Sequence, residues 1–311
     1  MAAAPQKRRE TVPVHGLVLL NKPAGLTSNQ ALQKVKRLLK ARKGGHTGSL
    51  DPAATGMLPL CFGEATKVSA YLLDADKTYR VVAKLGESTD TADADGKLNA
   101  SAHVPDLDAA RWAEILAGFL GESEQIPPMY SALKKDGKRL YELARQGQVV
   151  ERAARPVRIS EIELLEYHGR RLAFRVSCSK GTYIRTLVED VAAVAGTLAH
   201  TVVLHRETVA GFAADDMLEL TELEELAADG DLDALYARLL PIDSALQHWP
   251  SCELQAADCE RFERGQPVAA NAEWPQGTLL RVYDQAARFV GIAESVSEGR
   301  LAPKRVFNLA P

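Results

Sequence analysis

Apolar positions near the start of the chain change from a continuous run to a helical spacing. Residues 16–22, GLVLLNK, are mostly apolar and lead into the turn residues PAG, which is typical of a short strand. In residues 27–42 the apolar side chains recur three and four positions apart, with basic side chains between them. This spacing predicts an amphipathic helix, and Ser28 stands where its N-cap is expected.

Three later segments have equally clear periods. Residues 78–86, TYRVVAKLG, and residues 171–178, RLAFRVSC, alternate between apolar and polar side chains, as half-buried strands do. Residues 182–195 return to helical spacing, and Gly196 is a natural residue to end that helix.

The tail beyond residue 250 has a different texture. Short apolar runs such as TLLRVYD and RFVGIAES are separated by turn residues, which predicts a small β domain over residues 251–311. Strands and helices mix along the chain without a regular strand–helix–strand rhythm. We therefore expect an α+β fold with a mixed, largely antiparallel sheet rather than a doubly wound parallel one.

Charge is unevenly distributed in a chain whose formal net charge is only −3. Residues 1–50 carry ten Lys and Arg and a single acidic residue, and residues 134–158 carry eight Lys and Arg against three acidic residues. Residues 215–233 contain no basic residue. Such a chain can present a basic face to a polyanion, although solvated helix faces give the same pattern. Composition leaves both interpretations open.

Cysteine usage and hydropathy exclude several classes of protein. The four cysteines form no C-x-x-C pair and have no histidine cluster near them, so we expect neither a metal site nor a disulfide framework. The N-terminal MAAAPQKRRE lacks the apolar centre of a signal peptide, and no run of 18 apolar residues occurs. We expect a cytoplasmic protein without a membrane span.

Two cofactor-like motifs fail on inspection. Residues 90–96, DTADADG, resemble a calcium loop, but the first and twelfth positions of that loop are Thr91 and Ala102. A polar hairpin is the better interpretation. The chain has neither of the glycine-rich patterns that cradle a nucleotide, so we expect no cofactor.

The stretch GGHTGSLDPAATGMLPL, residues 44–60, carries the most chemistry. Asp51 followed by a proline is a common helix start, so Asp51 can be the N-cap of a short helical turn closed by Gly56. Alternatively, the small residues before Asp51 let the backbone approach a ligand, and the carboxylate acts as a nucleophile or base. The local sequence alone favours the capping interpretation.

Five segments in order resemble one family, the bacterial tRNA pseudouridine-55 synthases of the TruB type. GHTGSLDPAATGMLPLCFGEATK is similar to the family's catalytic motif. LLNKPAGLTSNQALQKVKR, DKTYRVVAKLGESTDTADADG, QIPPMYSALKKDGKRLYELARQG and CSKGTYIRTLVEDV resemble its other motifs, and the tail resembles its PUA-type domain. The resemblance covers nearly the whole chain from about Gly16.

The resemblance implies an isomerisation of one uridine in the T loop of tRNA, at position 55, without a cofactor or metal. Asp51 matches the essential carboxylate and Arg185 its paired arginine. Tyr79 matches the active-site tyrosine, and Tyr183 and Leu204 match residues that line the uridine pocket. Without the resemblance, Arg185 reads as an exposed helix residue and the tyrosines as core.

The resemblance also assigns the RNA contacts. His46 matches the histidine that enters the T loop as the target base flips out, and Lys22 matches a residue that supports the motif from behind. The basic segment 127–158 corresponds to the family's thumb. The expected phosphate contacts are Lys138, Arg139, Arg145, Arg152, Arg155 and Arg206.

These implications give a domain layout and leave two alternatives. We expect a disordered basic arm over residues 1–12, a catalytic domain over 13–250 and a PUA-like RNA-binding domain over 251–311, acting as a monomer without a protein partner. One alternative is an enzyme directed by guide RNA, as in archaeal and eukaryotic relatives. The other is a protein that serves chiefly to assist tRNA folding.

Overall fold

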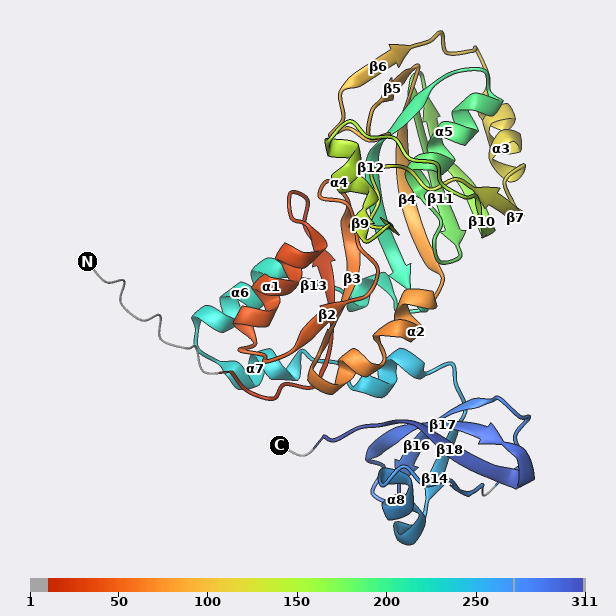
Figure 1. Cartoon of the computed structure of the whole chain (residues 1–311). Coiled ribbons are helices and arrows are strands. Elements are labelled where there is room, and N and C mark those ends of the chain that lie inside the picture. The colour runs from red at the N-terminus through yellow and green to blue at the C-terminus, as the bar shows by residue number, and fades with distance from the viewer. Residues whose placement is uncertain (1–10, 271, 310–311) are drawn as a thin grey trace.

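The computed structural model describes residues 11–270 and 272–309 of the chain. A long mixed sheet forms the centre of the larger part of the structure (Figure 1). Across the sheet, the strands are β13 (Leu218–Glu219), β1 (Gly16–Lys22), β3 (Thr55–Phe62), β12 (Ala199–Val209), β4 (Lys77–Leu85), β11 (Arg171–Cys178), β10 (Arg155–His168) and β7 (Gly121–Gln125), with β2 (Gly44–His46) beside β3.

The strand directions confirm the expected fold class. The pairs β1–β13 and β3–β12 are parallel, and every other neighbouring pair named above is antiparallel. The sheet is therefore mixed and largely antiparallel, in an α+β arrangement. The strands predicted from residues 16–22, 78–86 and 171–178 are all present as β1, β4 and β11.

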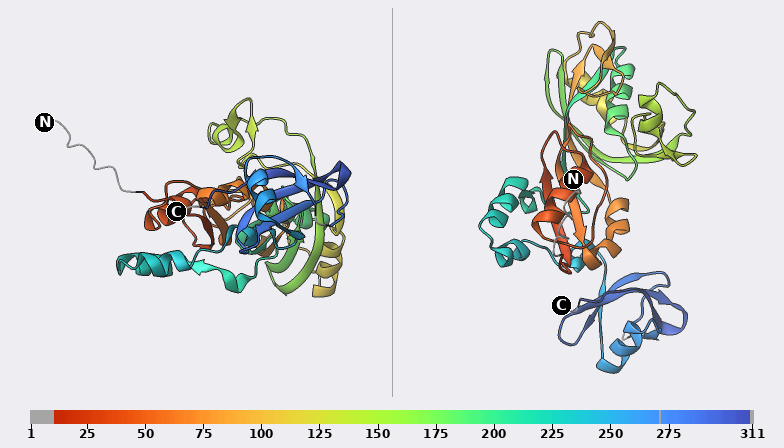
Figure 2. Two further views of the ribbon diagram at one scale, coloured as in Figure 1. Left: turned by 90° about the horizontal axis from the view of Figure 1, so that it is seen from below. Right: turned by 60° about the vertical axis from the view of Figure 1, so that its left-hand side comes forward.

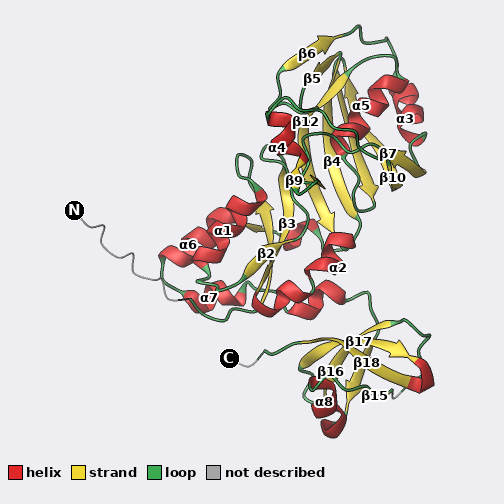
Figure 3. Ribbon diagram, in the orientation of Figure 1, coloured by secondary structure: helices red, strands yellow, loops and turns green. Residues whose placement is uncertain are grey.

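Helices pack on the sheet in two groups (Figure 3). The helices of the larger part are α1 (Ser28–Leu38), α2 (Ser69–Asp74), α3 (Ala109–Ala117), α4 (Leu140–Arg145), α5 (Ile184–Val194), α6 (Leu220–Ala228) and α7 (Leu232–Ala237). Tyr79, Val81 and Leu85 of β4 belong to one continuous core with apolar residues of α1, α3 and α5. Because strand side chains alternate, the intervening Arg80 and Lys84 lie on the opposite face.

Helix α1 begins one residue earlier than the sequence indicates. Thr27 is the N-cap and forms a capping box with Gln30. Ser28 is buried instead, and its hydroxyl donates to the carbonyl of Leu50 at 3.0 Å and accepts from the amide of Leu50 at 2.8 Å. The expected cap is wrong because Ser28 ties the helix to the loop before β3.

Two small hairpins extend from the sheet. Strands β5 (Glu87–Thr89) and β6 (Leu98–Ser101) pair around residues 90–96, which confirms the polar hairpin expected there. Strands β8 (Lys134–Lys135) and β9 (Lys138–Arg139) pair before α4. Figure 2 shows the segment around α4 projecting from the sheet as a lobe of its own. We call residues 127–158 the thumb, although residues 155–158 already belong to β10.

The C-terminal part has its own sheet and its own core, as expected from the tail. The strands are β14 (Ser251–Leu254), β16 (Leu279–Asp284), β17 (Phe289–Val296), β18 (Arg300–Val306) and β15 (Val268–Ala269), with helix α8 (Ala256–Glu263). A separate apolar cluster joins Phe289, Ile292 and Phe307 to Leu17 and Cys61 of the larger part. The two parts therefore pack directly on one another.

The expected N-terminal arm is too long by at least one residue. Its residues 1–10 lie outside the described part of the chain. Val12 is already part of the fold, because its amide donates to the carbonyl of Lys40 and it forms a parallel bridge with Ala41.

No helical turn follows Asp51, which contradicts the capping interpretation. Residues 51–54 form an irregular turn, and strand β3 begins at Thr55. Gly56 lies in β3 with φ at +100°, directly opposite Arg206 of β12. A Cβ at Gly56 would stand 2.7 Å from the backbone nitrogen of Arg206 and closer still to its carbonyl oxygen. The close approach of two parallel strands, rather than the end of a helix, requires glycine here.

Gly56→Ala tests this requirement. We expect a loss of about 3 kcal/mol in the free energy of unfolding, because the new Cβ meets backbone and the left-handed φ is strained. The measurement is urea denaturation. Gly45→Ala in β2 is the matched control, since nothing lies within 4 Å of its added Cβ. Equal midpoints for the two variants would contradict the steric argument.

Candidate active site

The loop between β2 and β3, residues 47–54, carries Asp51 and is held from behind by a buried lysine. Lys22, at the end of β1, is completely buried. Its ammonium group donates to the carbonyls of Pro23, Leu26 and Pro52 at 2.9, 2.8 and 3.2 Å. Burial lowers the pKa of Lys22 to about 8, against the raising effect of the Asp51 charge. Lys22 thus fixes the backbone beside Asp51 without reaching solvent.

A second buried cation holds the other side of the loop. The side chain of Arg206 is 1% exposed, with Nε donating to the carbonyl of Met57 at 2.6 Å and one Nη donating to that of Gly48 at 3.0 Å. Arg206 was expected among the phosphate contacts, and that expectation is wrong. Side chains alternate between the two faces of the sheet along β12. The Arg206 guanidinium is enclosed because it lies on the same face as Tyr79, which we call the inner face.

The ion pair expected from the sequence is present. Arg185, in the first turn of α5, is 5% exposed, and its Nε lies 2.9 Å from a carboxylate oxygen of Asp51. Its two terminal nitrogens donate to the carbonyls of Thr91 and Tyr130, each at 2.7 Å. Arg185 is therefore a buried partner of Asp51 and not an exposed helix residue.

A second carboxylate, which the sequence analysis did not single out, contacts the same arginine. Asp93 Oδ2 lies 3.3 Å from Nη1 of Arg185, and Asp93 Oδ1 accepts hydrogen bonds from the Thr91 hydroxyl and the Asp95 amide. Asp93 belongs to residues 90–96, which were set aside as a failed calcium loop. The sequence did contain one indication that Asp93 is important, because residues 90–96 belong to a segment that resembles one of the family's motifs.

The charge on Asp51 depends on a balance between burial and its neighbours. Burial raises the pKa of Asp51, Arg185 opposes that shift, Asp93 and Asp95 add to it, and Lys22 opposes it. Because no helix starts at Asp51, a helix dipole does not contribute. Arg185 is consequently the main group that favours the ionised carboxylate.

Three side chains expected to line a pocket come from different elements. Tyr79 lies on β4 and is 8% exposed. Leu204 lies on β12 opposite Val81, so it shares the face of β4 that carries Tyr79. Tyr183 immediately precedes α5, where the side-chain amide of Gln125 bonds both its backbone N–H and its carbonyl.

The ionisation of both tyrosines responds to the charged residues of the site. Burial raises the pKa of Tyr79 and Arg206 opposes that shift. Burial also raises the pKa of Tyr183, and the charge of Asp51 contributes to both shifts. The phenols therefore stay protonated close to the carboxylate.

His46 lies at the end of β2, between the Asp51 loop and the thumb. Burial lowers its pKa, and the charges of Arg206 and Arg139 lower it further. The ring is therefore neutral near pH 7. Its Nδ1 is buried without a hydrogen-bond partner in the described part of the chain. Arg139, whose charge acts on the ring, belongs to the thumb.

The thumb presents most of its expected basic residues to solvent. Lys138, Arg139, Arg145 and Arg155 are exposed. Arg139 and Arg145 lie over the ring of Tyr141, with 6.0 and 5.5 Å from guanidinium carbon to ring centre. Arg152 differs, because it is half-buried and its Nε and Nη1 lack partners among the residues described.

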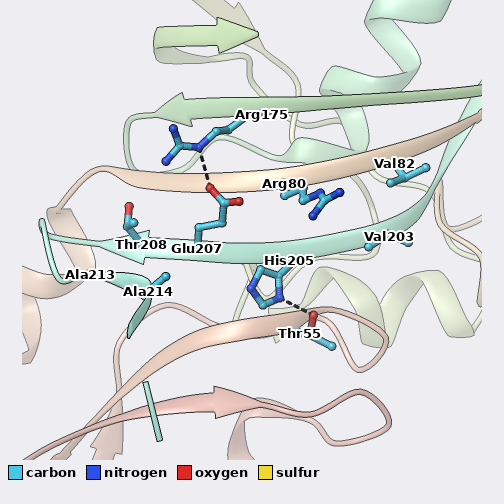
Figure 4. Close-up of a pocket in the computed structure, with 10 residues that line it drawn as sticks. All are labelled: Thr55, Arg80, Val82, Arg175, Val203, His205, Glu207, Thr208, Ala213 and Ala214. Atoms are coloured by element: carbon cyan, nitrogen blue, oxygen red, sulfur yellow. Dashed lines mark hydrogen bonds and ion pairs between the residues drawn. The ribbon is translucent and has the colours of Figure 1, made fainter. Parts of the chain in front are cut away.

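A groove lies on the face of the sheet opposite to the one that carries Tyr79 (Figure 4). It measures about 900 Å³ and is lined by Arg80 and Val82 of β4, Arg175 of β11, and Val203, His205 and Glu207 of β12, among others. These positions alternate along the strands with those of Tyr79, Leu204 and Arg206. The groove is therefore separate from the candidate site, and His205 bonds Thr55 rather than facing Asp51.

Two kinds of feature are absent from residues 11–270 and 272–309. No group of three or more His, Cys, Asp or Glu side chains is arranged to hold a metal ion there. No helix there is long and apolar enough to cross a membrane.

Comparison with family models divides the chain among three parts of one family. Residues 36–184 match the N-terminal domain of the TruB family of pseudouridylate synthases. Residues 185–247 match a tRNA pseudouridylate synthase B C-terminal domain, and residues 250–307 match the C-terminal model of pseudouridine synthase II TruB.

Curated relatives match over nearly the whole chain. A Pseudomonas aeruginosa protein named tRNA pseudouridine synthase B is 50% identical, covering 97% of this chain and 98% of its own. A Nitrosococcus oceani protein of the same name is 47% identical, with 97% of each chain covered.

Solved structures support the fold. A Cbf5–Nop10–Gar1 complex matches with a TM-score of 0.71 at 23% identity, covering 94% of this chain and 84% of that chain. A structure of an H/ACA RNP bound to a substrate RNA matches with a TM-score of 0.73 at 21% identity, covering 97% and 92%. At these identities the likeness concerns the fold alone.

Arg185→Gln tests the electrostatic balance at Asp51. Loss of the guanidinium charge removes the main group that lowers the pKa of Asp51, so this pKa should rise further above its ordinary value. At a pH between the pKa of Asp51 in the wild type and its pKa in the variant, a smaller fraction of Asp51 is ionised in the variant. Carboxyl-carbon NMR titration measures this directly. Arg175→Gln, whose partner Glu207 lies on the other face of the sheet, is the control and should leave the titration unchanged.

Proposed function

The chain belongs to the TruB family of pseudouridylate synthases, and from that premise we propose that it converts uridine 55 in the T loop of tRNA to pseudouridine. It is an isomerase acting on uridine in RNA. The reaction breaks the C1′–N1 bond, turns the uracil, forms a C1′–C5 bond, removes the proton from C5 and leaves one on N1. Substrate and product have the same atoms, so the step balances without a co-reactant.

The ion pair between Asp51 and Arg185 is the observation that carries this proposal. The chemistry needs one ionised carboxylate beside the ribose and the base, within surroundings that exclude water. The Asp51 side chain is 39% exposed and that of Arg185 only 6%, so the carboxylate opens toward a substrate while its partner stays buried. Asp51 is thereby available, and Arg185 favours its ionised form against the effect of burial.

The side chains around Asp51 suit a uridine turned out of its stack. Tyr79 offers an aromatic ring on which the uracil can stack, and Leu204 and Tyr183 provide further walls. Excluding water protects the broken glycosidic bond from hydrolysis. His46 is neutral and has an unpaired ring nitrogen, which suits a group that enters the T loop in place of the flipped base.

Asp93 adds a positioning function to this site. It shares Arg185 with Asp51, and the backbone carbonyls of Thr91 and Tyr130 accept hydrogen bonds from the two terminal nitrogens of the guanidinium. Together these contacts orient the guanidinium with Nε toward Asp51. In this proposal Asp93 acts on the reaction only through Arg185.

The grip on tRNA comes from the thumb and the C-terminal domain. Exposed thumb arginines make phosphate contacts, and the small β domain over residues 251–311 extends the contact along the tRNA. We propose that the chain acts as a monomer in the cytoplasm. We also propose that it needs no guide RNA, because a relative named tRNA pseudouridine synthase B is 50% identical over 97% of this chain.

Asp51→Asn tests the catalytic assignment. We expect tritium release from C5-labelled uridine in unmodified tRNA, without guide RNA, to fall by about 10³-fold or more, since the ionised carboxylate is lost. The tRNA dissociation constant should stay within about threefold, because Asp51 makes no phosphate contact. Asp106→Asn, an exposed carboxylate elsewhere, serves as the control. A wild-type rate for Asp51→Asn would refute the assignment.

The thumb contacts are tested by their salt dependence. Arg139→Ala combined with Arg145→Ala should weaken tRNA binding and reduce the slope of log K against log salt by about 1.5, the contribution of two phosphate contacts. Arg111→Ala with Arg238→Ala removes the same charge from exposed helix residues that pair with glutamates. The thumb has no place in the interface if both double variants show the same slope.

A further inference from the structure

Four basic side chains gather where α1 ends and the chain turns into β2 (Figure 1). Arg37 lies in the last turn of the helix, and Lys40, Arg42 and Lys43 follow it. All four are exposed, and none forms a side-chain hydrogen bond or an ion pair with any residue that the structure describes. We call these four residues the basic turn. No acidic residue occurs between positions 11 and 50 to offset their charge.

The carboxylates that come near this part of the chain are engaged elsewhere. Lys34, one turn earlier in α1, pairs with Glu224 at 3.2 Å. Glu64 follows the residue whose amide donates to the Lys43 carbonyl, and it already pairs with Lys67. The positive charge of the basic turn therefore stays unpaired within the described protein.

The backbone of the basic turn is fixed although its side chains are free. The carbonyl of Lys40 accepts from the amide of Val12 at 2.9 Å, and the amide of Arg42 donates to the carbonyl of Val12 at 3.3 Å. The carbonyl of Lys43 accepts from the amide of Gly63 at 3.0 Å. A surface whose backbone is already ordered loses less conformational freedom on binding. The turn is therefore preformed for a ligand that carries several negative charges.

Lys40 occupies a position that suits glycine better. Its φ is +49°, in the left-handed region. The amide of Lys40 donates to the carbonyl of Arg37 at 3.2 Å, and the amide of Ala41 donates to that of Lys36 at 3.0 Å. This pair of bonds forms a helix end that glycine usually closes. Among the five described residues other than glycine that have a positive φ, Lys40 is the only basic one. A cation is thus present here despite backbone strain.

A purely structural explanation covers only part of the basic turn. The C-terminus of a helix attracts cations, which accounts for Arg37. That attraction falls off within the last turn of the helix, so it does not account for Arg42 and Lys43. Several closely spaced cations on a fixed backbone suit the phosphates of a nucleic acid, which position it without reading its sequence.

Strand β2 places the basic turn beside the candidate site. The strand is extended at about 3.3 Å per residue, so Lys43 lies about 10 Å along the chain from His46. In the proposed function His46 enters the T loop of tRNA. The stem that continues from this loop carries a phosphate at every nucleotide, and its backbone is the polyanion closest to the basic turn.

We propose that the basic turn binds phosphates of the T stem of tRNA, as a second electrostatic contact separate from the thumb. The inference rests on the proposed function for the identity of the RNA. Its tests measure binding and stability only. Their failure is therefore distinguishable from failure of the catalytic assignment, which Asp51→Asn tests.

Arg42→Ala combined with Lys43→Ala tests the contact, and both changes leave the backbone hydrogen bonds of the turn in place. The dissociation constant for an unmodified T stem–loop hairpin should rise by about tenfold at low salt, and the slope of log K against log salt should fall by about 1.5. Lys34→Ala with Arg238→Ala is the matched control, since it removes the same charge from residues that pair with glutamates of α6. The same slope in both double variants would overturn the proposal.

The length of the RNA stem tests which phosphates are bound. The same double variant is compared with the wild type on a second hairpin, which keeps the loop but has half the stem. The variant should lose affinity for the full hairpin and bind the short one within about twofold of the wild type, because the phosphates that it contacts are then missing. An equal loss on both hairpins would refute the assignment to the stem.

Lys40→Gly separates binding from stability. Glycine relieves the left-handed strain, so the urea midpoint should rise when it is measured in about 1 M salt, where the attraction of the lysine charge to the helix end is screened. Affinity for the full hairpin at low salt should fall by about threefold, the effect of one phosphate contact. A residue that serves only the fold would give a lower midpoint and unchanged affinity. Unchanged affinity at any midpoint would remove Lys40 from the contact.

Discussion

One buried guanidinium, that of Arg185, determines how the candidate site is assembled. It lies in the first turn of α5 and contacts Asp51, Asp93 and the backbone at Thr91 and Tyr130. These contacts come from the Asp51 loop, the hairpin after β5 and the segment that leads into the thumb. A guanidinium this deeply buried is tolerated only when its N–H groups have hydrogen-bond acceptors. The three segments that supply these acceptors must therefore converge on Arg185. The position of Asp51 is a consequence of that requirement.

The Asp51 loop is irregular, but its geometry is fixed by two other buried cations. Lys22 and Arg206 donate to the carbonyls of Pro52, Gly48 and Met57, which lie on either side of Asp51. The carbonyl oxygens of Gly48 and Pro52, which lie outside the strands, thereby have side-chain donors. Because these donors are part of the protein itself, the loop that carries the carboxylate is held in place without a bound substrate.

Side chains alternate between the two faces of the sheet, and this places the candidate site on one face and the groove on the other. Along β4 and β12, one set of side chains supplies the inner face with Tyr79, Leu204 and Arg206, and the other set supplies the open face with Arg80 and His205. The groove of about 900 Å³ is on that open face. The ion pair and the buried cations lie on the side of the inner face, where the candidate site is.

Sequence patterns alone determined the local elements, because alternation and helical spacing depend on neighbouring residues. They predicted β1, β4, β11 and α5, and the family-like motifs pointed to the pairing of Asp51 with Arg185. They did not predict that Asp51 lies in a turn before β3, that Thr27 rather than Ser28 caps α1, that Arg206 is enclosed, or that Asp93 reaches Arg185. Each of these depends on partners about 20 to 150 positions away in the chain, whose proximity is set only when strands pair and buried charges find their donors and acceptors. The residue types of the site were therefore readable from the sequence, whereas their burial and their partners were decided by the tertiary structure.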